Sequence, residues 1–122
     1  MVLVVTEGSF SQEVLDSPIP VLVSFWAPWC GLCRLVNPLL DRQESEWGSP
    51  VKVVSINADE NFKLANTYRL KTLPTILLIK NGAILSRFDD FKGRDDLRAA
   101  AETIQVTLGA LQSRYREAAQ RV

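Results

Sequence analysis

Two cysteines, Cys30 and Cys33, are the residues of this 122-residue chain whose spacing most clearly suggests chemistry. They are its only cysteines and stand two residues apart in the segment SFWAPWCGLCRLVNP. The backbone N–H groups at the start of the helix expected here stabilise a thiolate. A thiolate attacks disulfides, and a second cysteine one turn later can resolve the mixed disulfide. The pair therefore predicts dithiol–disulfide exchange.

The same cysteine pair has two other interpretations. Buried cysteines can pack simply as small apolar side chains. A structural zinc site takes four ligands, whereas the chain offers two cysteines and no histidine, which leaves a cluster bridging two chains as the metal alternative. The lack of histidine also excludes Ser-His and Cys-His hydrolase arrangements. We favour redox chemistry that needs no metal and no bound cofactor.

Composition limits the class of protein further. With 47% hydrophobic residues, a chain of this length can bury the core of one domain. Lysine plus arginine equals aspartate plus glutamate, 14 each, which gives no support for nucleic-acid or membrane-surface binding. The start, MVLVVTEGSF, lacks the basic region and long apolar run of a signal peptide, and no apolar stretch reaches membrane-span length. We therefore expect a cytoplasmic location.

Strands and helices alternate around the cysteine pair. Five apolar runs predict strands: Val2–Val5, Val21–Ala27, Val51–Asn57, Thr75–Lys80 and Ala83–Phe88. Four helices are expected: from Ser9, from the cysteine motif to about Trp47, over Glu60–Tyr68, and from Asp95 onward. The early alternation favours parallel pairing, and Asn81-Gly82 between two apolar runs is a strong hairpin signal. The chain is thus predicted to be α/β, with a central mixed sheet flanked by helices.

The stretch VLVSFWAPWCGLCRLVNPLL resembles the active-site segment of the thioredoxin family. VVSINADEN, LKTLPTILLIKNG and the terminal helix match further along, so the resemblance covers roughly residues 1–106. It implies a thioredoxin-like fold in which residues 1–106 form the domain and residues 107–122 extend its C-terminal helix. The Cys-Gly-Leu-Cys motif also resembles an atypical cyanobacterial type of this family.

The resemblance implies roles for individual residues. Cys30 would be the exposed nucleophile, and Cys33 would be the buried resolving cysteine. Pro74 would be held in cis beside the cysteines, and the backbone of Leu73 would pair with an extended client peptide. The substrate groove would be bordered by residues from the motif and the later loop: Trp29, Gly31, Leu32, Leu73 and Pro74.

A pair of serines departs from the family pattern. Ser24 stands where thioredoxins carry a buried aspartate that helps move the proton of the resolving cysteine, and Ser55 stands where a lysine partners it. Serine is no base near neutral pH, so we expect slower resolution of mixed disulfides. The alternative is that the substitution only removes a buried charge pair, with a neutral or stabilising effect.

Two further departures lie near the expected groove. Leu32 replaces the usual proline and restores an N–H, which we expect close to the Cys30 sulfur. This donor and the missing carboxylate both favour a potential less negative than the roughly −270 mV of typical thioredoxin. Asp90 stands at a usual glycine position, where its charge would exclude acidic partners and restrict the clients. Alternatively, Asp90 is an ordinary solvated loop carboxylate.

The terminal helix is longer than the family requires and carries a heptad-like apolar seam. The seam consists of Leu97, Ala101, Ile104, Leu108, Leu111, Tyr115, Ala118 and Val122. It can pack along its own domain, form a homodimer or partner contact, or fray in solvent.

These features predict a protein-disulfide reductase that is less reducing and more client-restricted than typical thioredoxin. Its partners would be disulfide-containing client proteins and an electron-donating reductase of unknown type. The alternative is a redox-responsive binding or regulatory module with little turnover. An oxidase or isomerase of an oxidising compartment is disfavoured because the sequence begins without a leader.

Overall fold

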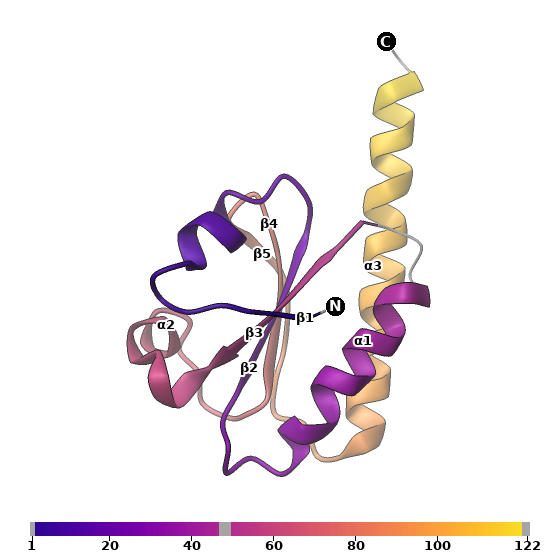
Figure 1. Ribbon diagram of the computed structural model, residues 1–122. Coiled ribbons are helices and arrows are strands. Elements are labelled where there is room, and N and C mark those ends of the chain that lie inside the picture. Colours follow the sequence, from indigo (N-terminus) through magenta and orange to yellow (C-terminus); the bar gives the residue numbers. More distant parts are fainter. Residues whose placement is uncertain (1, 47–49, 121–122) are drawn as a thin grey trace.

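The computed structural model describes the backbone of residues 2–46 and 50–120 and the side chains of residues 2–44 and 50–111. Five strands form one sheet in the order β1-β3-β2-β4-β5 (Figure 1). Their bounds are β1 Val2–Val4, β2 Val21–Trp26, β3 Lys52–Asn57, β4 Thr75–Lys80 and β5 Ala83–Phe88. β1 and β2 run parallel to β3, whereas β4 is antiparallel to β2 and to β5. The predicted mixed sheet is confirmed.

Helices cover both faces of this sheet. Their bounds are a π-helical turn Ser11–Leu15, a 3₁₀ turn Leu32–Leu35, α1 Val36–Glu46, a 3₁₀ turn Ala58–Glu60, α2 Phe62–Thr67 and α3 Arg94–Gln120. In Figure 1, α1 and α3 lie on one side of the sheet, and α2 and the first helical turn lie on the other. This layering is the α/β arrangement that the sequence predicts.

Three helix starts differ from the prediction. Ser9 caps no helix, because its hydroxyl accepts the Thr6 N–H at 3.1 Å and the first helical turn begins two residues later. The expected helix over Glu60–Tyr68 is a separate 3₁₀ turn followed by the shorter α2. The helix after the cysteine motif likewise opens as a 3₁₀ turn, and Trp47, its expected end, lies outside the described residues.

The core has two halves, one on each face of the sheet. Val23, Phe25 and Leu77 belong to the half beneath α2, while Leu22, Ile76 and Leu78 belong to the half beneath α1 and α3. Successive strand residues point to opposite faces, so a strand covered on both sides is apolar at most positions. This is why β2 and β4 read as nearly continuous apolar runs, with the buried Ser24 as the polar exception inside β2.

Tyr68 closes the α2 side of the core. Its ring packs against Phe10 and Phe25, with centroids 5.7 and 6.1 Å away. Burial raises the pKa of Tyr68 above its ordinary value because it disfavours the phenolate. The phenol therefore stays protonated at physiological pH and is not available as a base.

The β4–β5 hairpin turns at Asn81-Gly82, as predicted, with φ of +53° and +78°. Asparagine and glycine are the residues that best tolerate these left-handed angles in a two-residue hairpin loop. One extra residue in β5, Leu85, interrupts the ladder between the pairs Ile79–Ile84 and Leu78–Ser86. Beyond this bulge, the base of the hairpin leads directly into the loop before α3.

The first part of the predicted α3 seam packs on its own domain. Leu97, Ala101, Ile104 and Leu108 are buried there, and Leu111 is half-buried against the same core. The helix continues through residues 106 and 107 to Gln120, and its last turns extend past the sheet in Figure 1. Tyr115, Ala118 and Val122 lie outside the described side chains, so a homodimer through them stays a prediction, as does the division at residue 106. Within the described residues, none of the helices has both the length and the apolar character needed to cross a membrane.

Candidate active site

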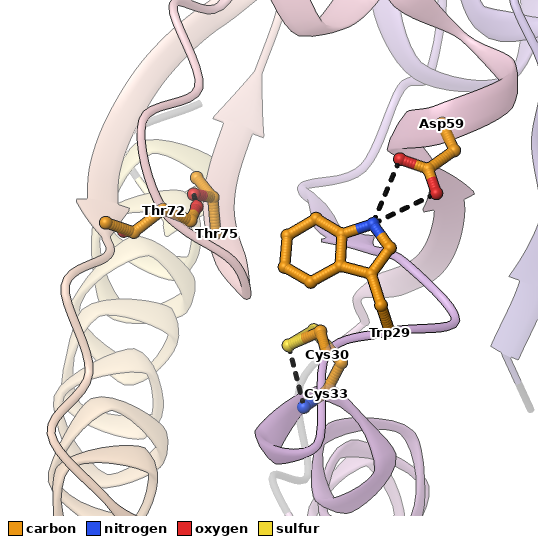
Figure 2. Close-up of a disulfide and its surroundings, with 6 residues drawn as sticks. All are labelled: Trp29, Cys30, Cys33, Asp59, Thr72 and Thr75. Atoms are coloured by element: carbon orange, nitrogen blue, oxygen red, sulfur yellow. Dashed lines mark hydrogen bonds between the residues drawn. A yellow bond between two sulfur atoms is a disulfide. The ribbon is translucent and has the colours of Figure 1, made fainter.

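The cysteine pair lies in the turn that follows β2. The Cys30 N–H donates to the carbonyl of Ala27 at 3.1 Å, and the Arg34 N–H donates to the carbonyl of Gly31 at 3.3 Å as the helix begins. Cys30 and Cys33 form a disulfide with their Cα atoms 5.3 Å apart (Figure 2). Because β3 and β4 flank β2 on either side, the reactive turn is fixed to the middle of the sheet.

A backbone donor reaches the Cys30 sulfur. The N–H of Cys33 lies 3.2 Å from Cys30 Sγ, a bond drawn in Figure 2. A hydrogen bond to sulfur stabilises a thiolate, so in the reduced protein this donor would favour the nucleophilic form of Cys30. The prediction that the Leu32 N–H supplies this donor is wrong, because the N–H that bonds the sulfur belongs to Cys33, three residues after Cys30. A side chain at the start of a helix commonly accepts an N–H from that position.

The two cysteines are equally covered. Cys30 is 6% exposed and Cys33 is 7% exposed, so the expectation of an exposed Cys30 beside a buried Cys33 is wrong for the disulfide form. In this form Cys30 Sγ is bonded to Cys33 Sγ and also accepts the Cys33 N–H. Access of a client disulfide to Cys30 Sγ therefore depends on the residues that surround the cysteine pair.

Trp29 is an exposed aromatic neighbour of the cysteine pair. It is 70% exposed, and its indole Nε1 donates to both carboxylate oxygens of Asp59, at 3.1 and 3.3 Å (Figure 2). Asp59 is held in turn, because its N–H donates to Asn57 Oδ1 at 2.9 Å. A carboxylate at the end of β3 thus orients an aromatic ring at the end of β2.

Replacing Asp59 by alanine should lower kcat/KM for a protein disulfide about five-fold, because Trp29 loses the charge-assisted bond that orders its ring. The reduction rate of a small disulfide should change less. Insulin and 5,5′-dithiobis(2-nitrobenzoate) supply the two measurements. Glu60→Ala, at the exposed neighbouring residue, is the matched control and should leave both rates unchanged. Equal effects of the two variants would contradict the role of Asp59.

A third segment, between α2 and β4, completes the site. The Leu73–Pro74 peptide bond is cis, as predicted for Pro74, with Pro74 buried and Leu73 half-buried. Thr75 Oγ1 donates to the carbonyl of Thr72 at 2.7 Å. In Figure 2, the segment bearing Thr72 and Thr75 runs on one side of the cysteine pair, and Asp59 lies on the other.

Two buried serines lie side by side in the sheet, on β3 and on β2, the strand that leads into the cysteine turn. Ser24 and Ser55 are paired across the parallel strands β2 and β3 and are 0% and 2% exposed. Ser24 Oγ has no hydrogen-bond partner within the described part of the chain. Ser24 and Trp26 are two residues apart on β2 and so project to the same face.

Trp26, on the same face of β2 as Ser24, lines a pocket of about 200 Å³. The pocket is lined by Trp26, Ala27, Cys33, Arg34 and Asn37. Trp26 Nε1 is buried and also lacks a partner among the described residues. Cys33 thus borders a pocket whose lining holds no carboxylate and no other group that accepts a proton at neutral pH.

Comparison with known proteins identifies the family. The family model described as Thioredoxin matches residues 1–103. Thioredoxin 1 of Nostoc sp. is 49% identical and thioredoxin 1 of Synechococcus elongatus 50% identical, each over 78 residues, or 64% of this chain and 73% of the relative. The thioredoxin of Rickettsia prowazekii is 48% identical over 82 residues, 67% of this chain and 78% of its own length.

The chain belongs to the thioredoxin family. Family membership, together with a Cys-x-x-Cys pair at disulfide distance, supports a thiol–disulfide oxidoreductase. The fold agrees, since the thioredoxin-like mixed sheet and C-terminal helix are both present.

Asp90, which the sequence predicts at the margin of the groove, lies in the loop after β5. Its φ of +56° falls in the left-handed region, where glycine fits most easily. Its N–H donates to Thr72 Oγ1 at 3.0 Å, which brings residue 90 beside the segment of Leu73 and Pro74. Its carboxylate side chain is 70% exposed and lies 3.7 Å from the ammonium of Lys92.

Sequence reasoning missed Asp59 and Thr72. Asp59 carried a signal, because it follows β3 directly and the carboxyl ends of neighbouring parallel strands meet at one edge of a sheet. Thr72 carried none, since its hydroxyl is engaged by Asp90, 18 residues later.

Proposed function

We propose that this chain reduces disulfide bonds of client proteins through the Cys30/Cys33 dithiol. The supporting observation is the position of Cys30 Sγ at the first turn of a helix, within 3.2 Å of a backbone N–H. The cis Leu73–Pro74 segment, which completes the site, supplies backbone for a client to pair with. Trp29, Gly31 and Leu32 would border the bound client.

The reaction conserves electrons in two exchanges. The Cys30 thiolate attacks one sulfur of the client disulfide, so the client S–S bond breaks, a mixed disulfide forms and one client thiolate leaves. Cys33 then loses its proton and attacks Cys30 Sγ, which forms the Cys30–Cys33 disulfide and releases the second client thiolate. The client gains two electrons and, with its thiolates protonated, two protons. A reductase must then return two electrons to the cysteine pair.

Client recognition would use the backbone of Leu73. An extended client segment beside the disulfide can pair with this residue as a short β-strand, which makes recognition independent of most client side chains. Gly31 leaves room for such a segment, since no heavy atom beyond its two chain neighbours lies within 4 Å of where its Cβ would be. Side-chain selectivity then falls to the groups at the margin, Trp29 and Asp90.

Ser24 would make the second exchange slow and the protein less reducing. Without a carboxylate beneath Cys33, the proton of Cys33 must pass to water or to the leaving thiolate. A buried carboxylate would also repel the thiolates, so its absence stabilises the reduced form and makes the potential less negative. The N–H on Cys30 Sγ belongs to Cys33, and a chain with proline at position 32 would also have it, so the expected shift now depends on Ser24 alone.

Two measurements test the proposed function. With dithiothreitol as electron donor, the protein should reduce the interchain disulfides of insulin and release its B chain as a precipitate. Equilibration against glutathione buffers should give a potential less negative than about −270 mV, the value of typical thioredoxin. Failure to reduce insulin would contradict the proposed activity, and a potential at or below the typical value would contradict the account of Ser24.

Replacing Asp90 by glycine should broaden the client range, because a negative side chain leaves the margin of the groove. Glycine keeps the N–H that holds Thr72 and accepts the positive φ, so the free energy of unfolding should change by less than about 1 kcal/mol. Reduction rates for a series of disulfide peptides of net charge from acidic to basic give the measurement. The gain should be largest for acidic peptides.

Asp90→Asn is the control that separates charge from size, since asparagine also tolerates left-handed angles. If charge excludes the acidic peptides, the asparagine and glycine variants should admit them equally. A client profile unchanged in both variants would show that Asp90 is an ordinary loop carboxylate.

A further inference from the structure

The register of the β4–β5 hairpin places Arg87 on the α2 side of the sheet. Arg87 pairs with Leu77 across the ladder, and directly paired residues project to the same face. Leu77 belongs to the core beneath α2, so Arg87 leaves the sheet on the side where that helix ends. Its side chain is about one-third exposed, at 31%, which places it at the margin of this face.

The end of α2 is a Schellman motif. The Leu70 N–H donates to the carbonyl of Ala65 at 3.0 Å, and the Arg69 N–H donates to the carbonyl of Asn66 at 3.1 Å. Arg69 has a φ of +50°, the left-handed angle that this motif requires at its turning residue. The motif supplies hydrogen-bond donors to carbonyls of the last helical turn. It leaves the carbonyls of Tyr68 and Arg69, the residues at which the chain turns away from the helix, without a donor from the motif.

Arg87 binds these two remaining carbonyls. Its Nη1 donates to the carbonyl of Tyr68 at 2.5 Å, and its Nη2 donates to the carbonyl of Arg69 at 2.9 Å. Its Nε donates to Asp89 Oδ2 at 3.0 Å, which fixes the plane of the guanidinium. A cation at the C-terminal end of a helix is also favoured by the helix dipole.

Residues 87–90 make a second contact with the loop between α2 and β4, through a hydrogen bond of Asp90. Asp90 donates its N–H to Thr72 Oγ1 at 3.0 Å, and the Thr72 carbonyl accepts from Thr75 Oγ1 at 2.7 Å. Residues 87–90 are thus attached to both ends of residues 69–72, directly before the cis peptide bond. Figure 2 shows the Thr72–Thr75 part of this loop beside the cysteine site.

We propose that Arg87 is a positioning residue for client binding. By holding the carbonyls of Tyr68 and Arg69, it fixes the course of residues 70–73 and therefore the place where the Leu73 backbone meets the client chain. This inference rests on the proposed function, in which a client pairs with Leu73. The hydrogen bonds of Arg87 go to the loop and to Asp89 rather than to the cysteines, so it acts on docking and leaves the thiol chemistry unchanged.

The planar guanidinium is what suits arginine to this role. Its fixed fork of donors binds two neighbouring carbonyls and a carboxylate at once, whereas the lysine ammonium is a compact point charge on a flexible stem. Lysine at position 87 would hold one carbonyl at most in good geometry. Arg87→Lys should therefore retain more client binding than Arg87→Met, but less than the wild type.

The test compares a protein disulfide with a small one in Arg87→Met, Arg87→Lys and the matched control Arg98→Met. Arg98 is an exposed arginine on α3, so this control removes the same charge elsewhere. Arg87→Met should lower kcat/KM for insulin about ten-fold, mainly through a higher KM, which corresponds to about 1.4 kcal/mol for the lost bonds. Its rate with 5,5′-dithiobis(2-nitrobenzoate) should stay within about two-fold, since strand pairing is not needed.

The remaining variants sharpen the comparison. Arg87→Lys should fall between wild type and Arg87→Met with insulin, and Arg98→Met should match wild type with both substrates. Equal losses of Arg87→Met on both disulfides would assign Arg87 a purely structural role and overturn the inference. Unchanged insulin kinetics would overturn it as well.

A readout without turnover separates this inference from the proposed function. A cysteine-bearing peptide is linked to Cys30 in the Cys33→Ser protein, and amide hydrogen exchange is followed at Leu73. The Leu73 amide should be protected when Arg87 is present and should exchange at least about ten-fold faster in Arg87→Met. Equal exchange in the two proteins would overturn the role of Arg87, whereas a wild type that leaves insulin intact would overturn only the proposed reductase activity.

Discussion

Cys30→Ser should abolish client disulfide reduction, lowering the rate by more than about a thousand-fold, because a serine hydroxyl beside a backbone N–H does not ionise near neutral pH. Cys33→Ser should fail in a different way. Its Cys30 still attacks the client, but no second thiol resolves the product, so the mixed disulfide accumulates. Mass spectrometry of the non-reduced protein should show one client per chain, released by dithiothreitol.

The double variant Cys30→Ser/Cys33→Ser is the control for this pair of predictions and should capture no client. Multiple turnover by Cys33→Ser would contradict the assignment of Cys33 as the resolving residue. Retention by Cys30→Ser of a partner that the wild type binds, together with its biological effect, would favour the redox-responsive binding module over the reductase.

Ser24→Asp should speed the second exchange about ten-fold or more, because it supplies a general base beneath Cys33. Stopped-flow measurement of mixed-disulfide decay isolates this step from the first attack. Desolvation at this fully buried position would raise the pKa of the new carboxyl, and only its ionised form accepts a proton. The gain should therefore appear as the pH rises through that pKa and vanish below it.

The same substitution should destabilise the protein by about 3 kcal/mol at neutral pH, because Ser55 offers the carboxylate no cation. The sign follows from linkage. A carboxyl whose pKa is higher in the folded than in the unfolded protein contributes most to the free energy of unfolding at low pH. That contribution is lost as the pH rises through the pKa of the folded protein. Chemical denaturation at a series of pH values should show the Ser24→Asp deficit growing toward neutral pH.

Ser24→Asn is the matched control, since it has nearly the shape of aspartate without the charge. It should leave the rate of mixed-disulfide decay unchanged, and its stability deficit should not vary with pH. If Ser24→Asn accelerated decay as much as Ser24→Asp, the effect would come from repacking rather than from proton transfer. Unaltered or slower decay in Ser24→Asp would contradict the proposed role of this position.

The sheet could be predicted from the sequence because its signals are local. The bounds of β4 and β5 and the turn at Asn81-Gly82 match the prediction residue for residue. Nearly continuous apolar runs identified β2 and β4, since a strand covered on both faces is apolar at most of its positions. The cysteine pair was equally visible, because its chemistry needs only two side chains one helical turn apart.

Contacts between distant segments could not be predicted in the same way. Trp29 and Asp59 are separated by 30 residues, and Arg87 and Tyr68 by 19, and in neither case does a repeating pattern mark the pair. The donor at Cys30 Sγ was misassigned because a side chain at a helix start can accept an N–H from two or three residues further on, and the residue types do not decide which of the two reaches the sulfur. The burial of Cys30 was missed because it is set by the turn around residues 27–33 rather than by the residue type.

The extra residue Leu85 in β5 divides the hairpin into an outer half and an inner half with independent registers. Because the bulge absorbs one residue, removing Leu85 would restore a regular ladder and still leave Arg87 opposite Leu77. Length changes near the hairpin tip can thus be accommodated without turning Arg87 away from the loop that it holds. The tip lies at the opposite end of β4 from the Leu73–Pro74 segment, so it is a suitable site for grafting a peptide or an affinity tag.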